Sequence, residues 1–303
     1  MSSNKELHKA KSGKNDEFYT QMSDIEKELK HYKEHLKGKV VFCNCDDPRE
    51  SNFVNYFCLN FNKIGLKKLI STHYDPEKST YKLEHDGVDF KETPLEENGD
   101  FRSPECVELL KESDVVITNP PFSLFREFVA QLVEHEKKFL IIGSLNAISY
   151  KEIFKLIREN KLWVGYNNGA KEYVVPNHYK FSREENGIKY QSMGNTYWFT
   201  NLDIHKRHED IILYKKYNST DYPKYDNYDA INVDKTKDIP VDYDGVMGVP
   251  ITFMDKYNPE QFEITGQMVT TKVDEFNHGY PYINGEKIYA RVVIKRRCNK
   301  WKE

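Results

Sequence analysis

The sequence of 303 residues has few of the features that mark membrane, secreted or metal-binding proteins. Its mean hydropathy is −0.77, and its most apolar run, residues 139–142, is far too short to cross a bilayer. The first 18 residues contain no apolar stretch, so we expect no secretory signal. Five cysteines are present, but only Cys43 and Cys45 lie close together, which favours neither a disulfide framework nor a zinc site. These absences predict a cytoplasmic protein without a membrane partner or a metal.

Neither sign of charge dominates the sequence. It has 45 Lys and Arg residues against 48 Asp and Glu residues, a formal net charge of −3. A partner such as nucleic acid would therefore have to bind a local basic surface. Residues 287–303 provide one, with seven Lys or Arg and one Glu, most densely at Lys295, Arg296 and Arg297. We interpret this segment either as a phosphate-binding surface or as a solvated basic tail.

The first 160 residues alternate short apolar runs with amphipathic helices. A content of 38% hydrophobic and 14% aromatic residues is typical of a folded globular protein. The predicted strands are residues 40–43, 66–71, 114–118 and 138–143, with a hairpin at 81–90. The predicted helices begin at Ser23, Ser51, Ser103, Ser123 and Ser149, and the first of them extends to about Lys37. This order predicts an α/β fold whose sheet is covered by helices on both faces.

The rest of the sequence is richer in predicted strands than in helices. Candidate strands lie at residues 162–165, 173–175, 189–191, 197–200, 249–254, 262–265 and 288–294. Residues 214–244 are rich in Tyr, Asp, Asn and Lys and are loop-like. At the other end of the chain, the polar residues 1–14 are predicted to form a mobile arm. A small β-rich region is therefore expected after the α/β sheet.

The Asn-Pro-Pro-Phe turn, residues 119–122, gives the most specific indication of function. It follows a predicted strand, and sheets of this kind bind ligands at the carboxyl ends of their strands. Neither proline has an N–H group, so the turn presents carbonyl oxygens, to which Asn119 adds that of its side chain. Asn119 and the Pro120 carbonyl can accept both hydrogens of a planar amino group while Phe122 stacks on its ring. The alternative is a turn without a ligand.

The Asn-Pro-Pro-Phe turn resembles the catalytic motif of amino methyltransferases that use S-adenosylmethionine. The whole chain resembles the EcoRI-type family of DNA adenine methyltransferases. The segments that carry the resemblance are NDEFYT (15–20), CNCDDP (43–48), TNPPFSLF (118–125), YWFTNL (197–202) and GVPITFMDKYNPEQFEITG (248–266). The resemblance implies methyl transfer from S-adenosylmethionine to N6 of an adenine flipped out of double-stranded DNA. It also implies a Rossmann-like, seven-stranded methyltransferase sheet with a small β-rich target-recognition region.

On this basis we expect three regions in the chain. The arm at residues 1–14 precedes a catalytic domain at 15–213, and residues 214–303 form a target-recognition or accessory region. An insertion near residues 166–195 is expected to face DNA, because side chains such as Asn195 suit contacts with adenine edges. A restriction endonuclease that acts on the same site is a further expected partner.

The resemblance assigns the catalytic roles to the Asn-Pro-Pro-Phe turn. Asn119 and Pro120 would hold the adenine amine, Phe122 would stack on the base, and Pro121 completes the motif. Tyr19 and Thr20, in the N-terminal motif, would lie against the methionine part of the cofactor.

The remaining cofactor contacts are expected in three loops. The Gly-rich loop of the wider superfamily is absent, and Cys45, Asp46 and Asp47 stand in its place. Either aspartate suits the ammonium of the cofactor, although Asp-Asp-Pro is also common in solvated turns. Asp75 is the candidate for the ribose hydroxyls and Tyr74 for stacking on the cofactor adenine. Asp100, beside Phe101, is the candidate acceptor for the adenine amino group; a turn or loop acid without a ligand is the alternative at both aspartates.

Three other functions remain compatible with these residues. The same turn can hold the amine of adenine in RNA or the amide of a glutamine in a protein. A catalytically inactive relative that only binds DNA is the third alternative, and the intact Asn-Pro-Pro-Phe turn argues against it.

Overall fold

The computed structural model describes residues 19–76, 80–175 and 181–297. The arm predicted at residues 1–14 and the end of the basic segment, residues 298–303, lie outside this range. The chain divides into two compact units, residues 1–147 with 164–202, and residues 148–163 with 203–303. The second unit thus includes a segment from the middle of the chain and begins before residue 214. The functional division that we expect at residue 213 stays a prediction.

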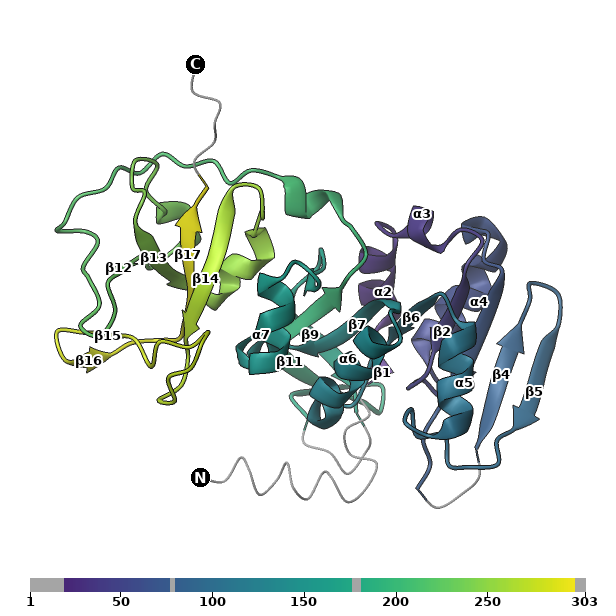
Figure 1. Cartoon of the computed structure of the whole chain (residues 1–303). Helices are drawn as coiled ribbons and strands as arrows, with labels where there is room; N and C mark the ends of the chain where they lie inside the picture. The colour runs from purple at the N-terminus through teal and green to yellow at the C-terminus, as the bar shows by residue number, and fades with distance from the viewer. Residues whose placement is uncertain (1–18, 77–79, 176–180, 298–303) are drawn as a thin grey trace. The chain divides into compact units, whose positions relative to one another are not determined.

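The first unit is built on a mixed sheet with the strand order β1-β9-β11-β7-β6-β2-β3-β4-β5 (Figure 1). The short strands β8 and β10 pair with β11, so the described sheet has eleven strands and is wider than the resemblance implied. The strands are β1 (Tyr19–Thr20), β2 (Val40–Cys43), β3 (Lys68–Thr72), β4 (Tyr81–His85), β5 (Phe90–Pro94), β6 (Val115–Thr118), β7 (Lys138–Ser144), β8 (Trp163–Val164), β9 (Gly169–Val174), β10 (Arg183–Glu185) and β11 (Ile188–Thr200). The helices are α2 (Met22–Leu29), α3 (Lys33–Leu36), α4 (Asn52–Ile64), α5 (Pro104–Glu112) and α6 (Phe125–Glu134).

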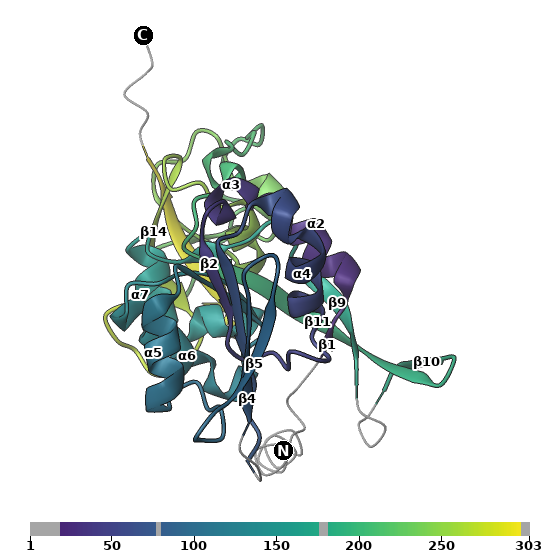
Figure 2. The ribbon, with the colours of Figure 1, turned by 90° about the vertical axis from the view of Figure 1, so that its right-hand side faces the viewer.

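Four parallel strands, β7, β6, β2 and β3, form the centre of this sheet. Phe42 in β2 pairs with Val116 on one side and with Ile70 on the other. Every residue of β2 and β6 is buried, as the short apolar runs predict. Figure 2 shows α2 and α4 on one face of the sheet and α5 and α6 on the opposite face. The predicted α/β fold with both faces covered is therefore confirmed.

Several local predictions are confirmed by their hydrogen bonds. The Ser51 hydroxyl accepts the N–H of Phe53 at 3.0 Å and so caps α4. The Ser103 hydroxyl accepts the N–H of Cys106 at 3.3 Å, directly before the proline that begins α5. The hairpin expected at residues 81–90 is the antiparallel pair β4–β5. Caps and turns of this kind are local, so the sequence alone can predict them.

Three predicted helix starts are wrong. The helix expected from Ser123 is α6, which begins at Phe125 with Leu124 as its N-cap, because Ser123 lies within the 3-10 helix η1 (Phe122–Leu124). The helix expected from Ser23 begins at Met22 without a side-chain cap and breaks into α2 and α3. Tyr32 lies at the break, and its hydroxyl donates to the Glu28 carboxyl group at 2.8 Å. The helix expected from Ser149 is α7 (Lys151–Arg158), and its N-cap is Tyr150. Ser149 instead ends the short 3-10 helix η2 (Leu145–Ser149). In each case the residue at the N-cap makes no side-chain capping hydrogen bond, so the local capping signal was not decisive.

The two strands predicted at residues 189–191 and 197–200 form one long strand, β11. Its pairing with β9 shifts register between Met193 and Thr196, which is a β-bulge. β10 and β11 form a hairpin that extends from the sheet (Figure 2). Its turn contains Asn186 and Gly187, both with positive φ, 51° and 78°, as a two-residue hairpin turn requires.

The second unit has its own small sheet in the order β12-β13-β17-β14. Its strands are β12 (Ile231–Asn232), β13 (Val246–Pro250), β14 (Phe262–Met268), β15 (Tyr282–Ile283), β16 (Glu286–Lys287) and β17 (Arg291–Arg296), of which β15 and β16 pair only with each other. The strand predicted at residues 249–254 ends at Pro250, and the 3-10 helix η5 (Ile251–Lys256) follows. The β-rich character predicted for this part of the chain is confirmed. None of the helices in the described part of the chain has the length and apolar character that a bilayer crossing requires.

Candidate active site

The carboxyl ends of β2, β3 and β6 meet at one edge of the first sheet. β2 lies between β3 and β6, and the order of the strands along the chain reverses there, as it does where open α/β sheets bind ligands. The segments that follow these strands are residues 44–48, 73–75 and 119–122. The N–H of Asp46 donates to the carbonyl of Thr72 at 3.0 Å, and that of Cys45 donates to the hydroxyl of Thr118 at 3.2 Å. The structure thus brings together the loops that the sequence singled out.

Asp46 has hydrogen bonds to two of the neighbouring elements through its side chain. The residue is buried, with 7% of its surface exposed. One carboxylate oxygen accepts a hydrogen bond from the hydroxyl of Ser51 at 2.7 Å, and the other accepts one from the hydroxyl of Thr118. The N–H of Asn119 also donates to this carboxylate. The side chain therefore joins the start of α4 to the end of β6.

The carboxylate of Asp46 is a charge held inside the protein by these three donors. Burial raises the pKa of Asp46 from about 3.8 to about 6, although the hydrogen bonds from Thr118, Ser51 and Asn119 act in the opposite direction. The group is therefore ionised at neutral pH and becomes protonated in mildly acidic solution. Burial, with the charge of Asp46, also raises the pKa of Cys43 and Cys45 well above the ordinary range, so both thiols stay neutral.

The Asn-Pro-Pro-Phe turn leaves β6 in an extended conformation, as predicted. Its first three residues belong to no helix or strand, and Phe122 begins the 3-10 helix η1 (Phe122–Leu124). Pro121 has φ −56° and ψ 123°, and its carbonyl accepts the N–H of Leu124 at 3.0 Å. Pro120 is buried, whereas Asn119 and Phe122 are half-buried. The turn is thus a rigid, non-helical segment at the edge where the three loops meet.

Thr20, from the segment expected at the methionine part of the cofactor, reaches this edge through α4. Its carbonyl accepts a hydrogen bond from the Nδ2 of Asn52, the residue after Ser51, at 2.8 Å. Two buried side-chain oxygens, Thr20 Oγ1 and Asn44 Oδ1, have no hydrogen-bond partner in the part of the chain that the structure describes. Buried polar atoms usually have partners, and both oxygens can accept hydrogen bonds from a ligand that carries donors. Of Tyr19 only the backbone is described, paired with β9.

Asp47 differs from Asp46 in being partly accessible. Its side chain is 30% exposed, and its Oδ2 lies 3.6 Å from the Nε2 of His73. Its Oδ1 accepts the N–H of Arg49 at 2.9 Å and the hydroxyl of Tyr81 at 3.1 Å. Asp47 is therefore the carboxylate of this loop that a ligand can reach.

The predicted residues Tyr74 and Asp75 lie in a loop that packs closely on the segment before α5. The N–H of Asp75 donates to the carbonyl of Asn98 at 2.9 Å. A Cβ atom on Gly99 would lie 2.0 Å from the carbonyl oxygen of His73, so this close packing requires glycine. Tyr74 is 43% exposed. Both predicted residues thus stand next to the site, and their contacts with a cofactor stay predictions.

Asp100 and Phe101 contact neighbouring side chains in the same segment. The carboxylate of Asp100 accepts hydrogen bonds from Nε and Nη2 of Arg102, at 2.9 and 2.7 Å. Partial burial would raise the pKa of Asp100, but Arg102 outweighs this effect and lowers it. Phe101 is buried against Phe128, with ring centroids 5.0 Å apart. Their predicted role at the cofactor adenine stays a prediction.

The basic residues predicted to bind DNA lie at the end of β17 in the second unit. Lys295 is exposed. The Nη2 of Arg296 lies 3.9 Å from Asp244, and the Nε of Arg297 donates to the carbonyl of Pro259 at 2.8 Å. The two guanidinium groups are thus oriented by contacts within their own unit.

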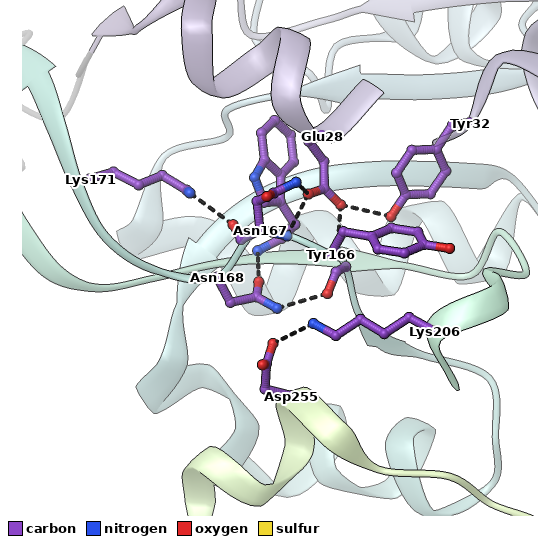
Figure 3. A network of polar contacts seen from close by, with 10 residues as sticks. Glu28, Tyr32, Tyr166, Asn167, Asn168, Lys171, Lys206 and Asp255 are labelled. Atoms are coloured by element: carbon purple, nitrogen blue, oxygen red, sulfur yellow. Dashed lines mark hydrogen bonds and ion pairs between the residues drawn. The ribbon is translucent and has the colours of Figure 1, made fainter. Parts of the chain in front are cut away.

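The predicted DNA-facing insertion of the first unit contains two kinds of asparagine. Asn195 is exposed within the β-bulge of β11. Asn167 and Asn168 instead form hydrogen bonds with other segments of the first unit (Figure 3). Asn167 donates to the Glu28 carboxyl group through its backbone at 2.7 Å and its side chain at 2.9 Å, and Asn168 bonds to the backbone of β11 at 2.9 Å. Of these three, Asn195 is the one whose side chain faces solvent.

A carbonyl-rich turn, buried unpaired acceptors and a strand-order reversal thus coincide at one edge of an α/β sheet. The sequence matches the profile described as "Adenine-specific methyltransferase EcoRI" over residues 6–297. The chain belongs to the EcoRI family of adenine-specific methyltransferases. The resemblance seen in the sequence is therefore confirmed. The enzyme is a site-specific DNA adenine methyltransferase, and its methyl donor is S-adenosylmethionine.

Three relatives support this assignment over nearly the full chain. The enzyme is 50% identical to the type II methyltransferase M.EcoRI of Escherichia coli, over 97% of each chain. It is 41% identical to the type II methyltransferase M.MpnI of Mycoplasma pneumoniae, over 97% of this chain and 98% of the relative. It is 40% identical to M.MgeORF184P of Mycoplasma genitalium, over 96% and 98% respectively. No solved structure gives a significant match.

The site of the methyltransferase fits S-adenosylmethionine. This cofactor carries an ammonium group and ribose hydroxyls, which are hydrogen-bond donors, and Thr20 and Asn44 offer buried oxygens without a partner in the described chain. The partly exposed carboxylate of Asp47 adds a negative charge beside them. In residues 19–76, 80–175 and 181–297, no three or more His, Cys, Asp or Glu side chains are grouped to hold a metal ion.

Sequence reasoning did not assign a functional role to Thr118, Ser51 or Asn44. Ser51 is predicted as a helix start and Thr118 as a strand end, and both predictions are correct. The structure adds that both hydroxyls bond to the carboxylate of Asp46. No sequence pattern indicates these two contacts, because Thr118 is far from Asp46 along the chain and the three residues come together only in the folded sheet.

Proposed function

We propose that the Asn-Pro-Pro-Phe turn holds the amino group of the target adenine during methylation. The side-chain carbonyl of Asn119 and the main-chain carbonyl of Pro120 accept the two amino hydrogens, and Phe122 stacks on the base. The observation that supports this most is the place of the turn. It follows a fully buried central strand at the reversal of strand order, and Thr118, the residue before it, bonds to Asp46.

The turn acts by stabilising the transition state rather than as a strong base. The lone pair of adenine N6 is delocalised into the ring, so the nitrogen is planar and a weak nucleophile. As the nitrogen attacks the methyl group it becomes tetrahedral and gains positive charge, so the two carbonyls bind its hydrogens more strongly. S-adenosylmethionine supplies the electrophilic methyl group when it is bound. The residues of the turn thus contribute position and preorganised acceptors.

The reaction requires the adenine to leave the double helix, because its amino group is otherwise paired and stacked. We propose that the base is flipped into the site, as enzymes that modify bases commonly require. Phe122, half-buried beside the two prolines, offers an aromatic face for the extruded base.

We also propose a cofactor site across the ends of β2 and β3. Asp47 and Asn44 suit the ammonium group, whereas the carboxylate of Asp46 already accepts hydrogen bonds from three protein donors. Thr20 suits the methionine part. The other proposed cofactor contacts are Tyr19, Cys45, Tyr74, Asp75, Asp100 and Phe101.

The partners that we propose follow from the charge of the surface and from the relatives. Lys295, Arg296 and Arg297 suit DNA phosphates, and Asn195 suits a base edge. The relatives are named type II methyltransferases and come from bacteria. We therefore propose that the enzyme works in the bacterial cytoplasm, without a membrane partner, beside a restriction endonuclease that cuts the same site.

Substitution of Asn119 tests the proposed catalytic role. We expect Asn119→Ala to lower kcat at least about a thousandfold, because one of two acceptors is lost, and to leave the Kd for S-adenosylmethionine within about threefold. The assay is transfer of labelled methyl groups to unmodified double-stranded DNA, with RNA and protein as parallel substrates. Near-normal kcat in the variant would show that Asn119 does not hold the amine.

A matched control uses an asparagine outside the site. Asn218 is exposed and bonds to Asp221 in the second unit. We expect Asn218→Ala to keep kcat within about twofold of the unmodified enzyme. Label that appeared only in RNA or protein would contradict the DNA substrate.

A further inference from the structure

We propose that Asp46 is a positioning residue for methyl transfer. Its carboxylate holds the Asn-Pro-Pro-Phe turn in its reactive geometry through the hydroxyl of Thr118 and the N–H of Asn119. This inference rests on the proposed function of the turn. It gives the aspartate a task that is different from binding the cofactor.

The hydroxyl of Thr118 is the link between Asp46 and the turn. The residue has no exposed surface. Its hydroxyl donates to Oδ2 of Asp46 and accepts the N–H of Cys45 at 3.2 Å. Since its proton and a lone pair are both engaged, the side chain has one orientation. Thr118 directly precedes Asn119, so the anchored side chain holds the residue from which the turn leaves the strand.

Asp46 is itself anchored to elements other than β6. Its N–H donates to the carbonyl of Thr72 at 3.0 Å, and its carbonyl accepts the hydroxyl of Ser71 at 2.7 Å, both in β3. Its Oδ1 accepts the hydroxyl of Ser51, the cap of α4, at 2.7 Å. The carboxylate therefore cannot follow the turn if the turn shifts. It is a fixed point against which Thr118 and Asn119 are placed.

Such a contact acts mainly on the chemical step. The turn must place two carbonyl oxygens at the amino group while the nitrogen faces the methyl group, and errors of about 1 Å in such placement commonly cost about a hundredfold in rate. The cofactor contacts proposed at Thr20, Asn44 and Asp47 do not depend on the hydroxyl of Thr118. Loss of that hydroxyl should therefore lower kcat more than it weakens binding of the cofactor.

Three hydroxyl variants of the full chain test this proposal. Thr118→Val removes the hydroxyl and keeps the shape, and Thr118→Ser keeps the hydroxyl. Thr200→Val is the matched control, because Thr200 is also a fully buried threonine of the sheet whose hydroxyl donates to the Phe139 carbonyl at 2.6 Å. For each we would measure kcat on unmodified double-stranded DNA, the Kd for S-adenosylmethionine by calorimetry, and stability in urea.

We expect Thr118→Val to lower kcat about thirtyfold with the Kd within about threefold, and Thr118→Ser to recover most of the loss. Thr200→Val should keep kcat within about twofold although it loses stability. The proposal would be overturned if Thr118→Val kept kcat within about threefold, or if Thr118→Ser were as slow as Thr118→Val.

A variant on the other side of the contact keeps the proposal testable if Thr118→Val does not fold. Asp46→Asn retains the shape of the side chain but replaces one acceptor oxygen by a donor. It should show the same loss of kcat without loss of cofactor affinity, whereas a loss confined to cofactor affinity would contradict the proposal. Asn119→Ala in the same assay separates the two hypotheses. If Asn119→Ala is inactive and Thr118→Val is not, the positioning role alone is wrong.

Discussion

The first unit contains two buried acidic side chains with similar hydrogen bonding but different surroundings. Glu28 is fully buried and accepts four hydrogen bonds, from the hydroxyl of Tyr32, the N–H groups of Tyr166 and Asn167, and the side-chain amide of Asn167 (Figure 3). Asp46 is 7% exposed and accepts bonds from two hydroxyls and one N–H. Each side chain thus joins segments far apart in the sequence.

The difference lies in what the donors belong to. The donors to Glu28 lie in the turn after α2 and in the segment before β9, neither of which is a loop at the carboxyl ends of the parallel strands. Two of the three donors to Asp46 belong to Thr118, at the end of β6, and to Asn119, the first residue of the Asn-Pro-Pro-Phe turn. Burial and hydrogen bonding alone therefore do not identify a functional carboxylate. The loop that it holds decides whether its loss affects stability or also the reaction.

Glu28→Gln should have the largest effect of the changes that test this contrast. The amide would turn donor hydrogens toward N–H groups that now face an oxygen, so we expect a loss of about 3 kcal/mol in the free energy of unfolding. Urea denaturation measures this loss. The kcat of the folded fraction should stay within about twofold of the unmodified enzyme. A variant that was fully stable but slow would show that Glu28, like Asp46, supports the reaction, and would contradict the difference between the two side chains.

Gly165→Ala disturbs the same network by crowding it, without replacing any of its hydrogen-bonding groups. A Cβ atom there would lie 2.2 Å from Oε1 of Glu28 and 2.8 Å from Cβ of Trp198. We expect a loss of about 2 kcal/mol in urea denaturation, because the packed side chains must shift. Gly194→Ala is the matched control, since no atom lies within 4 Å of the added carbon. Equal stability of the two variants would show that the space beside Glu28 is less restricted than the contacts indicate.

The pH dependence of the reaction sharpens the contrast at Asp46. Its pKa of about 6 implies that half of the carboxylate is lost at about pH 6, so we expect kcat to fall about twofold there and further below. Because this pKa lies above its ordinary value near 3.8, protonation favours the folded state. The contribution of Asp46 to stability therefore rises as the pH falls from about 6 toward 3.8.

Single-turnover methylation and urea denaturation between pH 5 and 8 would separate these two effects. The neighbouring thiols of Cys43 and Cys45 stay neutral in this range because burial raises the pKa of each. Asp46→Asn should lack the acidic decline in kcat. A rate that did not change with pH in the unmodified enzyme would contradict the role of the carboxylate.

Lys295→Ala should have the smallest effect and should alter neither carboxylate. Removal of one exposed charge should weaken DNA binding about threefold at low salt. It should also reduce the slope of the logarithm of the binding constant against the logarithm of the salt concentration by about one. Fluorescence anisotropy at several salt concentrations measures both. Lys224→Ala is the control, because Lys224 is exposed but paired with Asp229 at 2.8 Å. Equal salt dependence in both variants would contradict a phosphate contact at Lys295.

The sequence was sufficient for features whose cause is local. The apolar runs of β2 and β6, the caps at Ser51 and Ser103 and the Asn-Pro-Pro-Phe turn all depend on neighbouring residues, and each lies where it is predicted. The sequence did not indicate the break between α2 and α3. Tyr32, at this break, contacts Glu28, which also accepts the N–H of Tyr166, and contacts between segments so far apart cannot be read from the sequence.

The site shows the same limit. The sequence indicates the motif residues and a cofactor loop with two adjacent aspartates, but it cannot distinguish Asp46 from Asp47. In the structure one is buried on Ser51 and Thr118 and the other is partly exposed beside His73. This distinction depends on which strands are neighbours in the sheet, and hence on contacts between residues more than 70 positions apart.

The strand order of the second unit has a consequence for the synthesis of the protein. β17 lies between β13 and β14 in the small sheet, although it follows both in the chain (Figure 1). While the ribosome makes the chain, β14 therefore emerges before β17, the strand that pairs with it. Until β17 is made, the apolar side chains of β14 are exposed and its backbone groups are unpaired. Completion of this sheet must wait for the last strand, so slow translation near β17 would prolong a state that is open to aggregation.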